Sequence, residues 1–366
     1  YSSSMSEFCQ LAVCDVRKET DNAVCVTFDV PTALKDTFRF AHGQYLTLKA
    51  DIDGSEVRRS YSICAGIDDQ ELRVAIKRVE GGVFSNYANE SLQRGDTLEV
   101  LPPAGMFTCE LNPENEKSYL CIAVGSGITP VISIVKSILA REPLSRVALL
   151  FGNQRVVSIM FREELEQLKN RYMSRFQLIH ILSREVRDTE ILNGRINNRK
   201  GAELMRRLLD LTGIDEFFLC GPESMISEVS RGLRGAGIDE SRIHYELFGA
   251  SADDAAAVVE RHHERARRLG RKVCSVSVKS DGRETSFELS ADGENILDAA
   301  MAAGMDLPFA CKGGVCATCR AKLILGQVEM DLNHALEQGE LEAGYVLTCQ
   351  AHPLSNEVMI DFDAAK

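Results

Sequence analysis

Short runs of alternating apolar and polar residues dominate the first third of the chain. They lie at residues 23–30, 44–48, 56–63, 72–79 and 97–101, and glycine, aspartate and proline separate them. A period of two is typical of strands that bury one face, and closely spaced turns join such strands into antiparallel sheets. The pattern therefore predicts an antiparallel β-barrel or sandwich, which we place at residues 8–113.

Near residue 117 the period changes. Residues 118–124 form an almost wholly apolar run, a glycine-containing turn follows, and residues 131–140 have helical spacing. Candidate strands and helices then alternate at residues 146–151, 163–171, 176–182, 201–211 and 216–220. Apolar strands that alternate with helices are typical of a parallel sheet with right-handed crossovers. We therefore expect a second, α/β domain at residues 114–250.

A charged segment at residues 251–272 precedes a third region. Asp253 and Asp254 can cap a helix that Gly270 ends, so we expect a solvated, helical or partly ordered linker. Its last third is basic, with Arg265, Arg267, Arg268, Arg271 and Lys272. Beyond it, a predicted hairpin and helix open an α+β domain at residues 273–366; the hairpin strands are expected at 272–279 and 285–289 and the helix at 296–303.

Composition narrows the function classes. The chain has 366 residues, enough for two or three domains, and a net charge of −12. This acidity argues against nucleic-acid binding, and no apolar run approaches the length of a membrane span. Residues 1–7 lack the apolar core of a signal peptide, so we expect an artificial, disordered tail there and a cytoplasmic protein.

The acidity is uneven along the chain. Residues 273–366 contain 6 basic and 15 acidic residues, which leaves a net charge of −9 on this domain alone. We interpret this charge as a docking field, either for a basic patch on a partner protein or for the chain's own basic linker.

The chain has 12 cysteines, and they fall into two groups. Eight stand far apart, mostly in apolar runs, and we interpret most of them as buried free thiols of a cytosolic protein. These are Cys9, Cys14, Cys25, Cys64, Cys109, Cys121, Cys220 and Cys274. The other four lie close to the C-terminus and carry a more specific signal.

Cys311, Cys316 and Cys319 have C-x4-C-x2-C spacing, and Cys349 follows after 29 intervening residues. Four thiolates are what a [2Fe-2S] cluster needs, two for each iron, and Gly313, Gly314 and Ala317 let backbone N–H groups approach the sulfurs. A zinc site is the alternative, but structural zinc usually pairs two C-x2-C knuckles and only one is present. Residues 273–366 resemble the plant-type ferredoxin domain, a β-grasp fold. That resemblance implies that these four cysteines are the cluster ligands.

Two further motifs lie in the first domain. Arg59-Ser60-Tyr61-Ser62 could supply a cation for a pyrophosphate, a ring to stack on an isoalloxazine and a hydroxyl for its edge. Gly81-Gly82-Val83-Phe84-Ser85-Asn86 precedes a predicted short helix, whose N-terminal N–H groups could bind phosphate. With the nucleotide motif that follows, residues 8–249 resemble the ferredoxin–NADP reductase superfamily.

That resemblance implies a flavin site in the first domain. FAD is favoured over FMN, although phthalate-type reductases with a related set of domains carry FMN. The implied flavin contacts are Arg59, Ser60, Tyr61, Ser62, Gly82, Val83, Phe84 and Ser85, together with the backbone of Ala75, Ile76 and Lys77.

A nucleotide site is expected in the second domain. Gly125-Ser126-Gly127-Ile128-Thr129-Pro130 lies between a strand and a helix, where N–H groups can bind a diphosphate. The superfamily resemblance implies that Gly125, Gly127, Thr129 and Pro130 bind NADP. It also implies that Cys220-Gly221-Pro222 borders the nicotinamide.

A hydroxyl and an arginine at the end of the strand 178–182 favour NADPH over NADH. Ser183 and Arg184 stand where the superfamily binds the 2′-phosphate, and Arg195 could assist; an aspartate there would favour the free ribose. The second domain closes with His244-Tyr245-Glu246-Leu247-Phe248. By resemblance Cys220, Glu246 and Phe248 are candidates for a catalytic role near the flavin, although a plain last strand would explain the final segment nearly as well.

The three sites together indicate an iron–sulfur flavoprotein oxidoreductase. We expect electrons to pass from NADPH to FAD, to the [2Fe-2S] cluster and then to a partner protein. Glu260 and His263 have a di-iron ligand spacing, but no second E-x-x-H is present, so oxygen activation is expected on the partner. The segments 310–316, 326–330 and 344–350 closely resemble reductase subunits of phenylacetyl-CoA epoxidases, which implies a soluble di-iron oxygenase partner in phenylacetate catabolism.

Other functions share this order of domains. Reductases of Rieske-type oxygenases, such as ketosteroid hydroxylases, and reductases of hybrid-cluster proteins differ only in the surface that meets the partner. A redox-sensing module that uses the cluster as a switch, or a stand-alone flavin reductase with a vestigial ferredoxin domain, would need no oxygenase at all.

Overall fold

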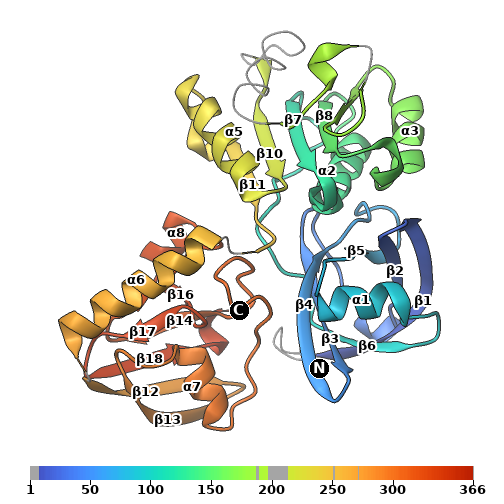
Figure 1. Cartoon of the computed structure of the whole chain (residues 1–366). Helices are drawn as coiled ribbons and strands as arrows, with labels where there is room; N and C mark the ends of the chain where they lie inside the picture. Colours follow the sequence, from blue (N-terminus) through green and yellow to red (C-terminus); the bar gives the residue numbers. More distant parts are fainter. Residues whose placement is uncertain (1–7, 187–188, 197–212, 250–251, 271, 366) are drawn as a thin grey trace. The chain divides into compact units, whose positions relative to one another are not determined.

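The structure, a computed structural model, describes residues 8–186, 189–196, 213–249, 252–270 and 272–365. The chain folds into two compact units (Figure 1). One contains Cys9–Val57 and Tyr61–Glu246, and the other is built mainly from the residues after Glu246. We describe each unit by itself.

A six-stranded antiparallel sheet forms the first part of the larger unit. Its order is β4-β3-β6-β1-β2-β5, with the short helix α1 (Val83–Glu90) packed against β5 and β3. The strands are β1 (Cys9–Thr20), β2 (Ala23–Asp29), β3 (Tyr45–Ile52), β4 (Ser55–Ser62), β5 (Leu72–Lys77) and β6 (Thr97–Val100). The antiparallel fold that the period of two predicts is confirmed.

Strand β1 is the one that the alternating pattern does not reveal. It spans 12 residues, but its register against β2 shifts between Val13 and Asp15 and again between Lys18 and Thr20. Each bulge places an extra residue in the strand and interrupts the regular alternation of faces. The periodicity that identifies the other strands is therefore lost in this one.

A five-stranded parallel sheet forms the second part of the same unit, with the order β11-β10-β7-β8-β9. Its strands are β7 (Ser118–Val124), β8 (Arg146–Asn153), β9 (Phe176–Leu182), β10 (Glu216–Cys220) and β11 (Ile243–Glu246). The order reverses between β7 and β10, and crevices at such reversals bind ligands in open α/β sheets.

Three helices of this sheet are described: α2 (Ile128–Arg141), α3 (Arg162–Arg171) and α5 (Glu223–Gly235). Helix α2 starts three residues earlier than residues 131–140 suggest, with Pro130 in its first turn, where a missing N–H costs no intrahelical bond. The sequence pattern does not predict α5. The predicted helix at 201–211 lies outside the described residues, as does the tail 1–7.

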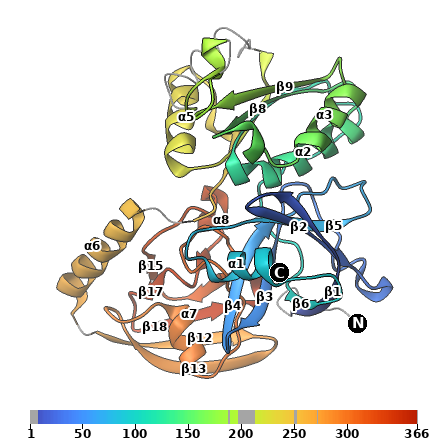
Figure 2. The same ribbon diagram turned by 45° about the vertical axis from the view of Figure 1, so that its right-hand side comes forward.

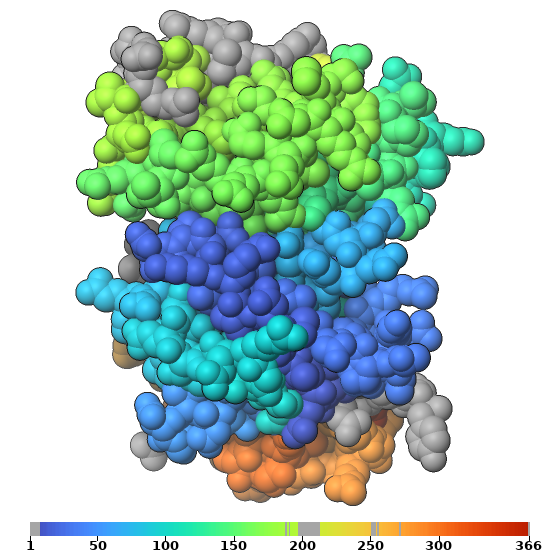
Figure 3. All heavy atoms as spheres, turned by 90° about the vertical axis from the view of Figure 1, so that its right-hand side faces the viewer, coloured from blue at the N-terminus to red at the C-terminus, as the bar shows by residue number. Residues whose placement is uncertain are grey.

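The antiparallel barrel and the parallel sheet share one core. Ala23, Cys25 and Cys64 of the barrel belong to the same buried cluster as Phe107 and most of helix α2. Ser133 on α2 donates a hydrogen bond of 2.6 Å to the carbonyl of Ala65. Figure 3 shows the atoms of the two parts, blue to cyan and green, lying directly against each other. The larger unit is thus continuous from the barrel to the parallel sheet.

The smaller unit is a mixed sheet of order β13-β12-β18-β14-β16, with the separate pair β15-β17. Its strands are β12 (Val273–Ser280), β13 (Arg283–Ser290), β14 (Arg320–Leu325), β15 (Val328–Met330), β16 (Tyr345–Leu347), β17 (Ala351–Pro353) and β18 (Glu357–Asp361). Helix α7 (Ile296–Ala302) packs against β13 and β17, and α8 (Gln338–Glu342) against β16. The expected hairpin is β12-β13, and its first strand also pairs in parallel with β18.

Helix α6 (Ala252–Leu269) occupies the segment expected to be a linker. Figures 1 and 2 both show it beside this sheet. The expectation of a solvated basic end is wrong for Arg265, whose side chain is 0% exposed, whereas Arg267 and Arg268 are exposed as expected. One face of α6 is therefore part of the smaller unit's interior. Arg271 lies outside the described residues.

Candidate flavin, nicotinamide and iron–sulfur sites

Two glycine motifs meet where the parallel sheet reverses its order. Gly125–Gly127 form a 3-10 turn directly after β7, and Gly221 directly follows β10. A Cβ atom on Gly127 would lie 2.2 Å from the carbonyl oxygen of Cys220, and one on Gly221 would lie 2.9 Å from the Cβ of Val124. Only glycine permits this approach, so the structure brings together two motifs that the sequence separates by almost 100 residues.

Thr129 and Pro130 lie in the first turn of α2 and are buried. The Thr129 hydroxyl donates a hydrogen bond of 3.0 Å to the carbonyl of Ser126. This bond ties the glycine turn to the start of the helix, whose N–H groups and positive dipole end favour a phosphate. Because both side chains are buried, Thr129 and Pro130 fit the expected diphosphate site as residues that shape its backbone, not as side chains that contact the ligand.

Cys220 ends β10, and its thiol is completely buried. Burial and the nearby Glu246 carboxyl both raise the pKa of this thiol, so it remains protonated and is not a nucleophile at neutral pH. Glu246 ends the adjacent strand β11 and pairs with Cys220 in register. The two chain ends therefore stand side by side at the carboxyl edge of the sheet.

Glu246 reaches the barrel. Its Oε2 accepts a hydrogen bond of 2.9 Å from the Ser62 hydroxyl at the end of β4. Burial raises the pKa of Glu246 to about 8, and the bond from Ser62 offsets only part of this rise. Because its pKa is about 8, the Glu246 carboxyl is mostly neutral at pH 7, and it is held against Ser62, one of the residues predicted to contact the flavin. Phe248 lies two residues beyond the end of this unit, and its side chain is half exposed.

Tyr61 and α1 form the next part of the candidate flavin site. The ring centroids of Tyr61 and Phe84 are 5.6 Å apart, and Phe84 is buried in the barrel core. The Ser85 hydroxyl accepts from Val79 N–H at 3.1 Å and donates to the Gly82 carbonyl at 3.3 Å. Phe84 and Ser85 thus use their side chains to fix Tyr61 and the Gly82 turn, while the N-terminus of α1 stays at the surface with an exposed Val83.

Arg59 and Ser60 lie on β4, and Arg59 is exposed and donates from Nη1 to the carbonyl of Arg58 at 2.7 Å. Ala75 and Ile76 on β5 are buried, so only their backbone is available to a ligand at the surface of the barrel.

Lys77 is a candidate ligand-binding residue through its side chain. The sequence analysis predicted a role only for its backbone. A Cβ atom on Gly125 would lie 3.7 Å from the Lys77 ammonium. Within the described part of the chain this ammonium has no hydrogen-bond or ion-pair partner, and burial lowers its pKa. A half-buried cation beside a glycine turn fits an anionic ligand. The cue in the sequence is a lysine at the end of a strand whose other residues are mostly apolar.

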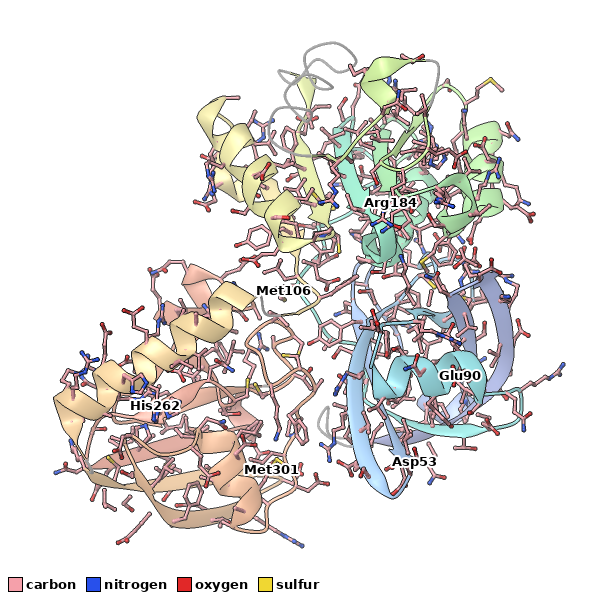
Figure 4. The ribbon with its side chains drawn as sticks, in the orientation of Figure 1. Asp53, Glu90, Met106, Arg184, His262 and Met301 are labelled. Atoms are coloured by element: carbon pink, nitrogen blue, oxygen red, sulfur yellow. The ribbon has the colours of Figure 1, made fainter. Side chains whose placement is uncertain are left out.

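Ser183 and Arg184 follow β9 at the same edge of the parallel sheet. Their N–H groups donate to the carbonyls of Asn153 and Gln154, both at 2.9 Å, which extends the pairing with β8. Arg184, labelled in Figure 4, and Arg195 are both exposed. The backbone is therefore fixed while the two guanidinium groups remain free to meet a ligand.

The four C-terminal cysteines meet in two pairs. The thiol of Cys311 contacts that of Cys316, and the thiol of Cys319 contacts that of Cys349. No group of three or more metal-binding side chains converges among the described residues. Two pairs fit the two irons of a [2Fe-2S] cluster, each with two thiolates, better than the single tetrahedral centre of zinc.

The surrounding loop also fits such a cluster. N–H groups of Gly313, Val315 and Cys316 point at the Cys311 sulfur, and that of Gly314 at the Cys349 sulfur. A Cβ atom on Gly314 would lie 3.1 Å from the carbonyl of Leu332, and its φ is +73°. The loop thus presents several donors to the sulfurs, as a negatively charged cluster requires. The Glu260 and His263 side chains, in contrast, are exposed on α6.

Among the described residues, no helix is long and apolar enough to cross a membrane.

Three known domain families match the chain in the order that the structure shows. The oxidoreductase FAD-binding domain matches residues 10–109, the oxidoreductase NAD-binding domain matches 121–231, and the 2Fe-2S iron-sulfur cluster binding domain matches 278–354. Together with the fold, these matches define the class: an iron–sulfur flavoprotein oxidoreductase that carries FAD-binding, nicotinamide-binding and [2Fe-2S] domains.

The relatives narrow this class. The E subunit of the 1,2-phenylacetyl-CoA epoxidase of Escherichia coli (strain K12) is 45% identical over 98% of this chain and 99% of its own length. This chain belongs to the family of that protein. The ferredoxin reductase component of 3-ketosteroid-9-alpha-monooxygenase from Rhodococcus rhodochrous is 32% identical, over 96% of each chain. The glycine betaine monooxygenase reductase subunit of Pseudomonas aeruginosa (strain UCBPP-PA14) is 30% identical over 89% of this chain and 88% of its own.

Two solved structures share the fold. Phthalate dioxygenase reductase has a TM-score of 0.57 and 21% identity, over 97% of this chain and 98% of its own. An intact type IV self-sufficient cytochrome P450 monooxygenase has a TM-score of 0.70 and 20% identity, over 97% of this chain and 41% of its own.

Proposed function

We propose that this chain is the reductase component of a soluble di-iron phenylacetyl-CoA epoxidase in the cytoplasm, with NADPH as the electron donor. The observation that carries the proposal is the 45% identity to the Escherichia coli epoxidase component over almost the whole of both chains. Bound FAD would accept a hydride and release single electrons, and the cluster would carry them singly.

The residues would divide the work as follows. Ser62 and Glu246 would hold a proton at the flavin edge, because their hydrogen bond joins the end of β4 to a carboxyl that is neutral at pH 7. Tyr61, supported by Phe84, would cover the flavin ring, and Phe248 is a further candidate shield. Cys311, Cys316, Cys319 and Cys349 would bind the cluster, two thiolates to each iron.

The nucleotide would lie across the reversal of strand order. The Gly125–Gly127 turn and the first turn of α2 would hold its diphosphate, and the Cys220-Gly221-Pro222 segment would lie beside the nicotinamide. Arg184, Ser183 and Arg195 support NADPH, because guanidinium groups bind a 2′-phosphate bidentately. Replacing Arg184 with alanine should raise the KM for NADPH and leave that for NADH almost unchanged.

A second candidate partner comes from the 32% identity to the ketosteroid monooxygenase reductase component. The direct test is NADPH-driven turnover with purified oxygenase components of phenylacetyl-CoA epoxidase and, separately, of a ketosteroid monooxygenase. Epoxide formation with the first and no product with the second is expected. Turnover of the ketosteroid system alone would overturn the partner assignment.

A variant separates the two halves of the electron path. Cys311→Ser should abolish NADPH-driven turnover with the oxygenase, whereas NADPH-dependent ferricyanide reduction at the flavin persists. Cys274→Ser, at a buried cysteine outside the cluster loop, is the matched control and should leave both activities intact. Oxygenase turnover that survives Cys311→Ser would instead favour a flavin reductase with a vestigial ferredoxin domain.

A further inference from the structure

Helix α6 makes a row of polar contacts with the rest of the smaller unit, which we call the cluster domain because it contains the four C-terminal cysteines. The residues of α6 that make these contacts form a stripe along the helix. Asp254, Arg261, Arg265 and Arg268 are separated by seven, four and three positions, which places them on one helical face. All four contact a single short stretch of the smaller unit, residues 329–334. A helix that served only as a tether would not need such a matched row of partners.

The outer contacts of the stripe are hydrogen bonds and ion pairs near the surface. Asp254 Oδ1 lies 3.0 Å from the ring Nε2 of His334. Arg261 donates to the Met330 carbonyl at 3.1 Å, and Arg268 pairs with Glu329. The Arg261 and Arg268 contacts are exposed and contribute little individually, so they orient the helix more than they hold it. The contact between Asp254 and His334 is partly buried.

The centre of the stripe is a buried charged network. Arg265 is 0% exposed, and its Nη1 and Nη2 lie 2.7 and 3.4 Å from the two carboxylate oxygens of Asp331. Asp331 Oδ2 also lies 2.9 Å from Nε2 of His352. A fully buried guanidinium is costly unless its geometry is well satisfied, and a well-packed apolar residue could have joined the helix to the sheet instead.

The stretch 329–334 touches both segments that carry the cluster cysteines. On one side, Asp331 N–H donates to the Gln350 carbonyl at 2.9 Å, and Met330 pairs with Ala351 in the β15-β17 ladder, close after Cys349. On the other side, His334 N–H donates to the Gly314 carbonyl at 3.0 Å. Residues 329–334 therefore connect α6 on one face with the loop around Cys311–Cys319 and the strand after Cys349 on the other.

We propose that Arg265 is a positioning residue for the iron–sulfur cluster, and that α6 works as part of the cluster domain. By fixing Asp331, Arg265 fixes the stretch 329–334, and this stretch in turn holds the Gly314 loop and the turn that carries Cys349 in place. His352 completes the link, since it binds Asp331 from the strand that follows Cys349. This inference rests on the proposed ligand set of four cysteines.

The test uses the full-length holoprotein with Arg265→Met, which keeps much of the length of the side chain and removes its charge and fork of donors. The cluster should lose its visible absorption in excess EDTA about tenfold faster than in the wild type, the lower end for loss of a residue that supports metal ligands. The EPR spectrum of the reduced cluster should broaden and its g-values shift, because the Cys349 thiolate is less firmly oriented. NADPH-dependent ferricyanide reduction should be unchanged.

Two variants separate positioning from a general loss of folding. Arg268→Met lies on the same stripe but is exposed, and it should leave the bleaching rate and the EPR spectrum as in the wild type. Arg265→Met combined with Asp331→Asn removes both buried charges, so it should bleach more slowly than Arg265→Met alone. A third variant, Arg265→Lys, keeps the charge without the fork and should give an intermediate rate.

A wild-type bleaching rate and EPR spectrum in Arg265→Met would overturn the proposal, as would equal effects of Arg265→Met and Arg268→Met. Failure of the underlying ligand assignment is a different result: the wild type would then hold no iron and acid-labile sulfide, or would keep both after Cys311→Ser.

Discussion

Glu246 combines a desolvated carboxyl with a hydrogen bond from Ser62. A pKa raised from 4.5 to about 8 means that the folded chain binds this proton more tightly than the unfolded chain does. Its contribution to stability is therefore complete below pH 4.5 and is lost as the pH rises through about 8. With a pKa of about 8 the carboxyl is mostly protonated at pH 7, which agrees with the role proposed for it as the group that holds a proton.

Glu246→Gln should remove this dependence on pH, because an amide cannot lose the proton. In the wild type the melting temperature of the protein should fall as the pH rises from 4.5 to about 8, and this slope should flatten in the variant. The rate of ferricyanide reduction at saturating NADPH should likewise lose its transition near pH 8. Glu240→Gln, at an exposed ion pair with Arg234, is the matched control, and a slope unchanged by Glu246→Gln would contradict the assignment.

Lys77 is predicted to bind an anionic part of the nucleotide or the flavin through its ammonium. Lys77→Met should raise the KM for NADPH roughly tenfold, the size expected for one hydrogen bond to a charged group, and should change kcat little. Steady-state ferricyanide reduction measures both constants. Arg78→Met, one residue along the chain and paired with Glu90 at the surface, should leave both constants unchanged. A large fall in kcat with an unchanged KM would mean that Lys77 acts elsewhere.

At the scale of elements, the nucleotide site depends on the close approach of the ends of β7 and β10. Gly127→Ala should push the two strand ends apart, since its Cβ would lie 2.2 Å from the Cys220 carbonyl. Overpacking of this kind costs about 2 kcal/mol, or a melting temperature roughly 5 °C lower for a unit of this size. Gly235→Ala, whose Cβ would meet nothing within 4 Å, should not lower it. An unchanged melting temperature in Gly127→Ala would show that the turn adjusts at no cost.

The elements also show which features a sequence alone can predict. Strands β7, β9 and β10 and helix α3 follow from periodicity almost to the residue, because nothing interrupts their patterns. The cluster loop is equally local, with three of its cysteines and its glycines within nine consecutive residues. In contrast, the sequence pattern does not predict β1, because two bulges interrupt its alternation of apolar and polar residues.

Other features depend on distant partners. The burial of Arg265 depends on Asp331 and His352, 66 or more positions away along the chain. The role proposed for Lys77 depends on Gly125, which only the fold brings near. Charged residues at the end of a helix or a strand are usually solvated. The sequence pattern therefore could not predict that Arg265 is buried or that Lys77 lies beside Gly125.

At the scale of the whole molecule, the acidic side chains of residues 273–366 fall into two groups: those that pair with α6 and those that do not. Part of the negative charge is neutralised internally, because Arg265 and Arg268 of α6 pair with Asp331 and Glu329. Most of the remaining acidic side chains are not involved in these pairs. The sequence analysis left two interpretations of this charge open: it could attract the chain's own basic helix or a basic partner protein. The ion pairs with α6 involve only Asp331 and Glu329, so most of the acidic side chains could still attract a partner.

The remaining acidity should steer a basic partner to the cluster domain. The rate of cluster oxidation by the oxygenase component should fall roughly tenfold as salt is raised from low ionic strength, because screening removes the attraction. Stopped-flow absorbance at the cluster bands measures this rate. The reduction of the flavin by saturating NADPH provides the internal reference, which salt should affect far less.

The position of the docking face can be tested with two charge-matched pairs of substitutions. Glu337→Gln with Glu342→Gln changes exposed acids at α8, which follows the stretch 329–334 beside the cluster loop. Glu284→Gln with Glu288→Gln changes exposed acids on the edge strand β13. Because electron transfer requires the partner to approach the cluster, the α8 pair should reduce both the rate and its dependence on salt more than the β13 pair does. Equal effects would mean that the charge acts only as a diffuse field around the domain, and a larger effect of the β13 pair would place the docking face at the opposite edge of the sheet.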